Sequence, residues 1–146
     1  MKTYIREIIE RSIVHTKIPK TWADYVHEPY STVTVKFPLE KSTGIDTIIG
    51  HRIVHSNHLL PTFGGLRFAD NLDLDTLGGL AELLSFKSAL MGIPFGGARG
   101  LVCIDPSKYT EEEKVLITRR FTVEMWKRSM ISCSTDVMCP DYGTTS

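Results

Sequence analysis

A glycine-rich segment between a predicted helix and a predicted buried strand constrains the fold of this chain more than any other feature. Asp73 or Asp75 is a suitable N-cap for a helix that runs to about Met91, where a glycine should end it. The turn Pro94-Phe-Gly-Gly-Ala-Arg-Gly100 follows, and then the apolar run 100–104. Such a run is typical of a strand buried on both faces. The pattern therefore predicts helices layered on a sheet.

The remaining periodicities predict strands and helices in alternation. In order, we expect a helix over 4–13, a strand over 31–37 bounded by Pro38, a turn over 41–44, a second strand over 45–55, a short strand over 64–68, a helix from the capping box of Thr110 and Glu113 to about Met130, and a last strand over 136–140. The first two strands should form a hairpin. We therefore predict an α/β fold, a three-layer sandwich with a mixed, mainly parallel central sheet. Residues 1–29 should form an N-terminal helix and connection, and residues 30–146 one domain.

Composition excludes several classes of partner. The chain of 146 residues has 17 Lys plus Arg and 17 Asp plus Glu, so its formal net charge is zero. This balance argues against nucleic acid or an anionic membrane as a partner, and it is compatible with a permanent oligomer or a larger complex. No apolar run is long enough to span a bilayer, and the N-terminus has neither a secretory nor a convincing transit signal. Three cysteines without C-x-x-C spacing suit free thiols in a reducing compartment.

Six motifs in order give a resemblance to a known family over most of the chain. They are Gly50-His-Arg-Ile-Val-His55-Ser, Gly64-Gly-Leu-Arg67-Phe, Phe86-Lys87-Ser-Ala, Pro94-Phe-Gly-Gly-Ala, Thr118-Arg-Arg-Phe-Thr122, and Asp136-Val followed by Pro140-Asp141. From about residue 31 to 144, this order resembles the N-terminal, substrate-binding and oligomerisation domain of glutamate dehydrogenases, the hexameric type of animal mitochondria above all. The resemblance implies a three-layer α/β domain that makes subunit contacts.

The resemblance also implies a site for an acidic 2-amino acid, and this chain departs from it. The family places a substrate-binding lysine before a Gly-Gly pair, where this chain has Phe63 before Gly64 and Gly65. An apolar ring cannot neutralise a carboxylate, and a charge-assisted hydrogen bond contributes about 1.5–3 kcal/mol. A second family lysine is present as Lys87. These four positions are therefore predicted to be a vestigial substrate site, unless Phe63 remakes the pocket for another ligand or Lys87 is only a solvated helix residue.

Two further positions concern the reaction itself. Arg99 stands where the family has a catalytic lysine, and Asp141 matches its catalytic aspartate. A desolvated lysine can reach the pKa that acid–base catalysis needs, whereas an arginine with a pKa above about 12 stays protonated. By itself, Asp141 before Tyr-Gly is equally a turn residue. We predict that neither residue is catalytic here.

No cofactor or metal is expected on this chain. The family needs a Rossmann domain after the aspartate, but the sequence ends at Ser146, and the glycines of 96–100 have the wrong spacing for a dinucleotide motif. NAD(P) would be used only if a separate Rossmann domain were supplied. His51, His55 and His58 lack neighbouring carboxylates or thiols, and we interpret them as structural or surface residues rather than metal ligands.

Three functional hypotheses follow, in order of preference. The first is a catalytically inactive, glutamate dehydrogenase-like accessory subunit of a larger protein complex, or a homo-oligomer. The second is the substrate-binding part of a split or fragmentary NAD(P)-dependent glutamate dehydrogenase. The third is a ligand-sensing module with a weak anion pocket around Lys87 and Arg99. The resemblance implies a mitochondrial location, and without it the cytoplasm is expected.

Overall fold

A computed structural model describes residues 2–41 and 44–144. Its elements are α1 (Lys2–Ile13), α2 (Lys20–Val26), β1 (Ser31–Lys41), β2 (Gly44–Val54), β3 (Thr62–Phe68), α3 (Leu74–Leu90), β4 (Gly96–Val102), a short 3₁₀ helix (Pro106–Lys108), α4 (Glu111–Trp126) and β5 (Asp136–Pro140). The N-caps of α3 and α4 are residues that the sequence predicted. Asp73 accepts a hydrogen bond from the Thr76 N–H at 2.6 Å, and Thr110 and Glu113 form the predicted capping box.

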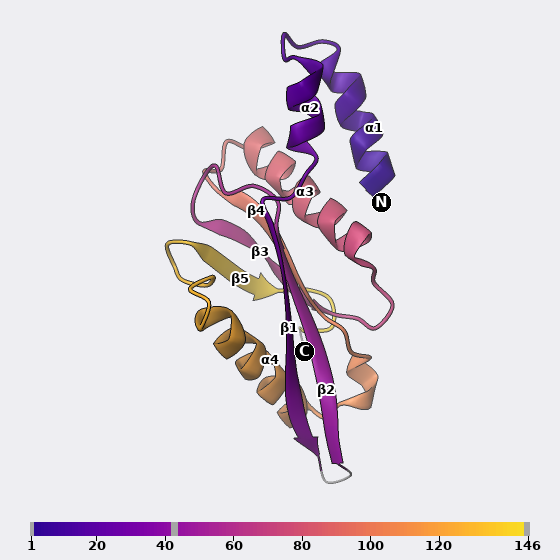
Figure 1. Ribbon diagram of the computed structural model, residues 1–146, viewed down its shortest axis with the longest axis vertical. Coiled ribbons are helices and arrows are strands. Elements are labelled where there is room, and N and C mark those ends of the chain that lie inside the picture. Colours follow the sequence, from indigo (N-terminus) through magenta and orange to yellow (C-terminus); the bar gives the residue numbers. More distant parts are fainter. Residues whose placement is uncertain (1, 42–43, 145–146) are drawn as a thin grey trace.

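The five strands form one mixed sheet in the order β1-β2-β4-β3-β5 (Figure 1). β1 and β2 form the predicted hairpin, and β2 also pairs antiparallel with β4. β3 lies between β4 and β5 and is parallel to both. Two ladders are thus antiparallel and two are parallel, while only β2 runs against the other four strands. The α/β class and the mixed sheet are confirmed.

Helices cover the sheet on both faces. On one face α4 buries Ile117, Phe121 and Met125 in a core that includes residues of β1–β4. On the other face Leu77 and Ala81 of α3 pack with residues of β2 and β4. Side chains alternate along a strand, and so adjacent residues of β4 enter different cores. This arrangement gives the predicted three layers.

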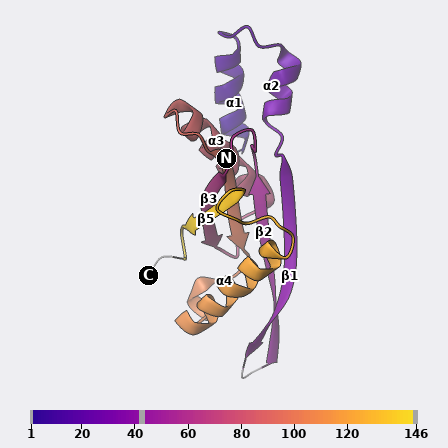
Figure 2. The same ribbon diagram turned by 90° about the vertical axis from the view of Figure 1, so that its left-hand side faces the viewer.

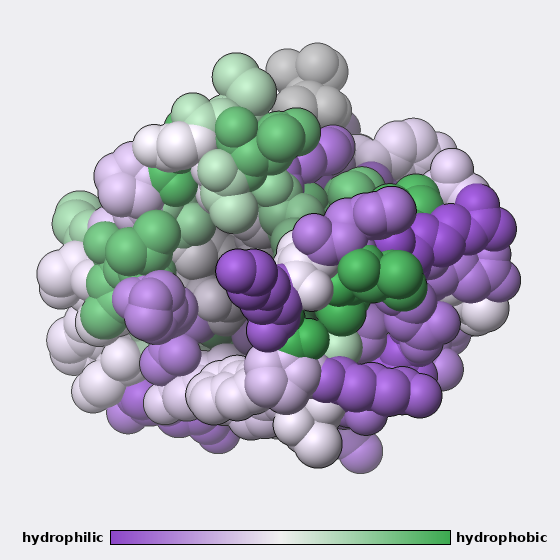
Figure 3. Space-filling view, turned by 90° about the horizontal axis from the view of Figure 1, so that it is seen from above, coloured by the Kyte–Doolittle hydropathy of each residue, from purple (hydrophilic) through white to green (hydrophobic). Residues whose placement is uncertain are grey.

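The helices α1 and α2 stand together beyond one end of the sheet (Figures 1 and 2). α2 was not predicted, because it has only seven residues and begins directly after Pro19. His27, which caps α2, lies 2.6 Å from Glu82 of α3, and both side chains are fully buried. Seen from this end, hydrophobic side chains lie exposed among hydrophilic ones (Figure 3), and Ile8 and Val14 of this region are exposed.

Three predicted boundaries were wrong. β1 continues through Pro38 to Lys41, because an edge strand does not need a donor at every position. The predicted glycine-rich turn over 94–100 ends at Phe95, because β4 begins at Gly96. α4 ends at Trp126 instead of about Met130. The predicted turn over 41–44 includes residues 42–43, which lie outside the described residues.

Candidate functional site

The sheet places the candidate residues of three strands together on the α3 face. Arg67 of β3 is paired with Leu101 of β4, and Leu101 packs against α3. Gly65 and Arg99 each lie two residues earlier on these strands and therefore face the same way. Asp141 follows directly on β5, the other neighbour of β3. Residues that are far apart in the sequence thus converge at one point beside β3.

Asp141 is held by two arginines at this point. Its Oδ2 accepts a hydrogen bond from Nη1 of Arg99 at 2.7 Å, and its Oδ1 lies 3.4 Å from Nη2 of Arg67. The backbone N–H of Tyr142 also donates to Oδ1 at 2.8 Å. Burial favours the neutral acid, but the Tyr142 N–H and the charges of Arg99 and Arg67 lower the pKa of Asp141 below its usual value. The carboxylate is therefore kept ionised.

The two arginines are not saturated by this carboxylate. The Nε atoms of Arg67 and Arg99 are both buried and have no hydrogen-bond partner among the described residues. The side chains retain 25% and 18% of their exposure, so the cluster is half-open to solvent. With two positive charges and one negative charge, it keeps a local positive excess.

A backbone lock fixes the position of Asp141. Its N–H donates to Oγ1 of Thr144 at 2.7 Å, and that hydroxyl lies 2.9 Å from the carbonyl oxygen of Leu66, to which it donates. A Cβ on Gly65 would lie 2.7 Å from Cβ of Asp141 and 2.9 Å from Nη1 of Arg99. Only glycine leaves room at this position for the ion pair.

The other glycines of the predicted motifs allow neighbouring segments of the protein to approach closely. A Cβ on Gly64 would lie 1.6 Å from the carbonyl oxygen of Ala98, and one on Gly97 would lie 2.3 Å from Oγ of Ser85. On Gly96, a Cβ would approach the carbonyl oxygen of Ser56 to 2.0 Å. These glycines face other parts of the protein at close range, which does not fit a phosphate-binding turn.

The two remaining predicted residues do not join the cluster through any bond. Phe63 is half-buried, and its ring centroid lies 5.9 Å from that of Phe95. Lys87 is exposed on α3, and its side chain makes no hydrogen bond or ion pair within residues 2–41 and 44–144. A role for either residue in substrate binding stays a prediction.

A fully buried pair was missed by sequence reasoning. Nε and Nη2 of Arg52 bind the two oxygens of Asp136 at 2.7 and 2.5 Å, and Nη1 donates to the carbonyl oxygen of Gly64 at 3.0 Å. Thr62 adds a hydrogen bond to Asp136 at 2.7 Å. One sequence signal could have revealed this pair. Arg52 is a charged residue inside the apolar end of a predicted strand, and such a residue needs a partner when it is buried.

The histidines of β2 and its end make structural hydrogen bonds. His51 Nδ1 lies 2.9 Å from Oγ1 of Thr34, and burial lowers the pKa of His51. His55 Nδ1 lies 2.8 Å from Oγ of Ser85, and its Nε2–H donates to the carbonyl oxygen of Val26 at 2.8 Å. In the part of the chain that the structure describes, no three His, Cys, Asp or Glu side chains gather as a metal site would require, and no helix is long and apolar enough to cross a membrane.

Comparison with known proteins identifies the family to which this fold belongs. Residues 29–146 match the family described as Glu/Leu/Phe/Val dehydrogenase, dimerisation domain. The chain belongs to this family.

Relatives and solved structures of the family support the assignment. A mitochondrial glutamate dehydrogenase of Dictyostelium discoideum is 43% identical over 75% of this chain and 22% of its own length. NAD-specific glutamate dehydrogenase A of Halobacterium salinarum is 37% identical over 93% of this chain and 29% of its length. A hetero-hexameric glutamate dehydrogenase from Thermus thermophilus, in a leucine-bound crystal structure, has a TM-score of 0.88 and 31% identity over 97% of this chain and 34% of its own. This chain thus spans about a fifth to a third of each of these proteins.

Proposed function

We propose that this chain is a catalytically inactive accessory subunit of a larger protein assembly, derived from a glutamate dehydrogenase. The observation that carries the proposal is the ion pair between Arg99 and Asp141. The alternative is that the chain is the substrate-binding part of a split or fragmentary NAD(P)-dependent glutamate dehydrogenase, which has the same structural support from the fold.

Proton transfer is the first reason for favouring inactivity. A general acid or base works best when its pKa lies near the working pH. The pKa of Asp141 is lowered, and both of its oxygens already accept hydrogen bonds, from Arg99, Arg67 and the Tyr142 N–H. The guanidinium group that Arg99 carries has five N–H donors and no acceptor, so it binds anions instead of taking up a proton. Neither side chain is suited to exchange protons with a substrate.

Loss of carboxylate binding is the second reason. Phe63 presents an apolar ring, packed towards Phe95, where the resemblance expects a lysine. The exposed Lys87 is then the sole lysine among the three family positions, and one charge-assisted bond contributes about 1.5–3 kcal/mol. An acidic amino acid would bind this site more weakly than it binds the site of an active dehydrogenase.

The assembly is supported by the family and by its members. The matching domain is described as a dimerisation domain, and the relative from Thermus thermophilus is described as hetero-hexameric. A hetero-hexamer contains more than one kind of subunit, as an accessory role requires. The name of the relative from Dictyostelium discoideum favours a mitochondrial location.

Activity measurements separate the proposal from its alternative. The purified chain is expected to give no glutamate-dependent reduction of NAD(P), and robust reduction would overturn the proposal. The complex isolated from cells is then tested with wild-type chain and with the Phe63→Lys/Arg99→Lys variant. Co-purification of a Rossmann-containing polypeptide, together with a rise in activity in the variant complex, would favour the split enzyme. Unchanged activity supports the accessory role.

Calorimetry tests the ligand-sensing hypothesis, which rests on the local positive excess at Arg67 and Arg99. Glutamate and 2-oxoglutarate are titrated into the wild-type chain and into Arg99→Met. Heat of binding at millimolar ligand that disappears in the variant would establish a sensing pocket. We expect no binding heat, because the Asp141 carboxylate competes with an added anion for both guanidinium groups and neutralises part of their charge.

A further inference from the structure

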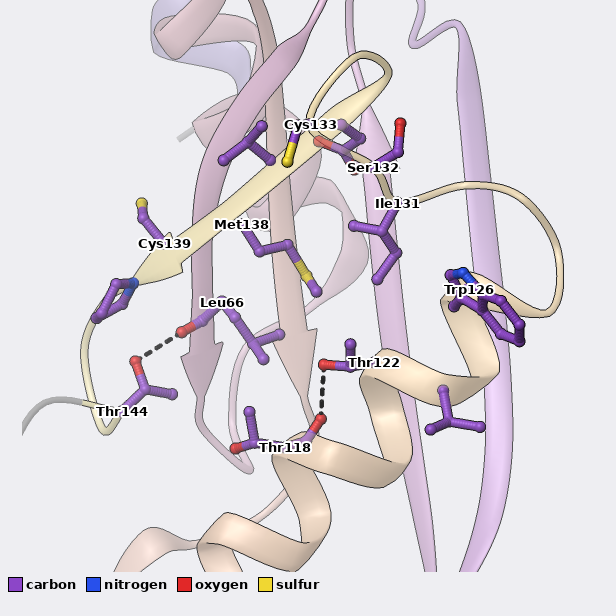
Figure 4. Close-up of a pocket in the computed structure, with 14 residues that line it drawn as sticks. Leu66, Thr118, Thr122, Trp126, Ile131, Ser132, Cys133, Met138, Cys139 and Thr144 are labelled. Carbon is purple, nitrogen blue, oxygen red and sulfur yellow. Dashed lines mark hydrogen bonds between the residues drawn. The ribbon is translucent and has the colours of Figure 1, made fainter.

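The two ends of the described chain are attached differently. At the C-terminal end, the hydroxyl of Thr144 donates to the carbonyl oxygen of Leu66 in β3 at 2.9 Å (Figure 4). At the N-terminal end, residues 2–29, which we call the N-terminal strap, contain α1 and α2 and stand beyond one end of the sheet (Figures 1 and 2). Among the described residues, none of the strap belongs to either hydrophobic core of the sheet.

The strap contributes few buried side chains of its own. Within the described residues 3–29, only Ile5, Ala23 and His27 are buried. A segment opens locally when it buries few apolar groups, and its opening then costs less than unfolding of the whole molecule. The strap is therefore expected to be less stable than the sheet.

The contact between the strap and α3 includes a buried ionisable pair. Nδ1 of His27 lies 2.6 Å from Oε1 of Glu82, and each side chain retains 1% of its exposure. Nε2 of His27 and Oε2 of Glu82 are also buried, and neither has a hydrogen-bond partner among the described residues. Taking such groups out of water costs free energy that one hydrogen bond offsets only in part. The pair therefore positions the strap but attaches it only weakly.

A second histidine joins the end of the strap to the same helix. Nε2–H of His55 donates to the carbonyl oxygen of Val26 at 2.8 Å, and Nδ1 of His55 lies 2.8 Å from Oγ of Ser85. Glu82 and Ser85 are three residues apart on α3, so the two contacts lie on one face of that helix. The strap is thus fixed to about one turn of α3 at the end where it joins the rest of the chain.

Farther along the strap, α1 meets α3 through apolar side chains that pack loosely. Ile8 of α1 and Leu83 and Phe86 of α3 are among the residues that line a hollow of about 690 Å³ between the two helices. Ile8 keeps 46% of its exposure, and Leu90, which also lines the hollow, keeps 85%. Side chains beside a hollow lose part of their dispersion contacts. This contact consequently adds little to the attachment of the strap.

We propose that the N-terminal strap opens from α3 as a unit while the five-stranded sheet stays folded, and that the His27–Glu82 pair sets how readily it opens. Opening returns both ionisable groups to water. It also uncovers Phe86, which lies beside His55 with ring centroids 6.1 Å apart and directly precedes Lys87. The strap therefore controls the exposure of the turn of α3 that carries one position of the predicted substrate site. An accessory subunit and a split enzyme would both have this strap, so its test is independent of the proposed function.

Native-state hydrogen exchange of the full chain tests the strap. Amides of α1 and α2 are compared with amides of β3 and β4 over a series of low urea concentrations. The opening constant of the strap amides should exceed that of the sheet amides at least about a hundredfold and should depend less on urea, because a local opening exposes less surface than global unfolding. Equal protection and equal urea dependence in the two groups would overturn the proposal.

Substitutions in the pair separate opening of the strap from fraying of its helices, which a change in α3 would not affect. Glu82→Leu leaves His27 buried without its partner and should raise the opening constant of α1 and α2 about tenfold or more. His27→Leu/Glu82→Leu leaves no ionisable group at this contact and should return the constant to the wild-type value or below. Glu28→Leu is the matched control, because this exposed carboxylate meets only the exposed Arg6, at 3.5 Å, and its loss should change the constant less than about twofold.

Three results in these variants would overturn the role of the pair. They are an unchanged opening constant in Glu82→Leu, a double variant that opens as readily as Glu82→Leu, and a response to Glu28→Leu as large as the response to Glu82→Leu. In every variant the sheet amides should stay at least about a hundredfold better protected than the strap amides. Circular dichroism checks that all of the variants fold.

Discussion

Two arginine–aspartate pairs lie on this sheet, and they differ in how completely each carboxylate is enclosed. Arg52 and Asp136 are almost without exposure, and their bidentate contact is completed by Thr62 and by a backbone carbonyl. Asp141 instead shares its oxygens between two arginines, and both it and Arg99 retain 18% of their side-chain exposure. The same two chemical groups are thus closed in one place and half-open in the other.

The difference shows which pair the fold depends on. A buried ion pair is tolerated only when nearly every donor and acceptor is satisfied, and the enclosed pair meets that condition between β2 and β5. The half-open pair leaves the Nε atoms of both arginines without partners. It contains Arg99 and Asp141, the two positions that the resemblance predicts to correspond to the family's catalytic residues.

The enclosed pair should respond most strongly to mutation. Arg52→Met leaves the Asp136 carboxylate buried without its counter-charge, and we expect a loss of about 3–5 kcal/mol in the free energy of unfolding. Urea denaturation measures it. The double variant Arg52→Met/Asp136→Leu should recover much of the loss, because no buried charge remains. A loss below about 1 kcal/mol in the single variant would contradict the assigned role.

Gly65→Ala should have the next largest effect. The added methyl group would meet Cβ of Asp141 at 2.7 Å, and the ion pair or β3 must shift, at about 1–3 kcal/mol. Gly78→Ala is the matched control, because its methyl group meets only Ile53 at 3.9 Å and alanine favours a helix by about 0.8–1 kcal/mol. The two variants should therefore move the urea midpoint in opposite directions; equal shifts would argue against crowding at Gly65.

The half-open pair should contribute a smaller, pH-dependent stability. Because the pKa of Asp141 is lower in the folded chain than its usual 3.8, its contribution is present above that value and is lost as the pH falls through the folded pKa. Unfolding is measured from pH 7 to pH 3 for wild-type and Asp141→Asn. The difference between them should be constant near neutral pH and shrink below about pH 4. A difference that grows as the pH falls would show that the sign is wrong.

Local signals in the sequence predicted much of the fold. The capping box at Thr110 needs only a hydroxyl and a glutamate three residues apart, and the hairpin of β1 and β2 follows from two adjacent alternating segments. The extension of β1 beyond Pro38 could not be predicted, since it depends on β1 being an edge strand. Position in the sheet is a property of the whole chain.

Two residues of the cluster, Arg99 and Asp141, were named from the sequence, but the bond between them was not predicted. The motifs pointed to Arg99 and Asp141, yet their contact depends on β5 pairing with β3. Arg67 belonged to a recognised motif without a role, and the structure places it on the same carboxylate. Arg52 and Asp136 are 84 positions apart, so no local pattern joins them.

The crowded glycines also bear on how such a chain changes over evolutionary time. Gly64 and Gly97 carry the close backbone approaches of β3 and β4, and a side chain at either position would collide with its neighbours. Phe63 and Arg99, one and two residues away, are half-buried, and neither side chain takes part in these close approaches. The glycines that the fold requires therefore differ from positions 63 and 99, to which the resemblance assigns substrate binding and chemistry. A lineage released from selection for the reaction can drift at 63 and 99 for as long as the glycines hold the sheet together.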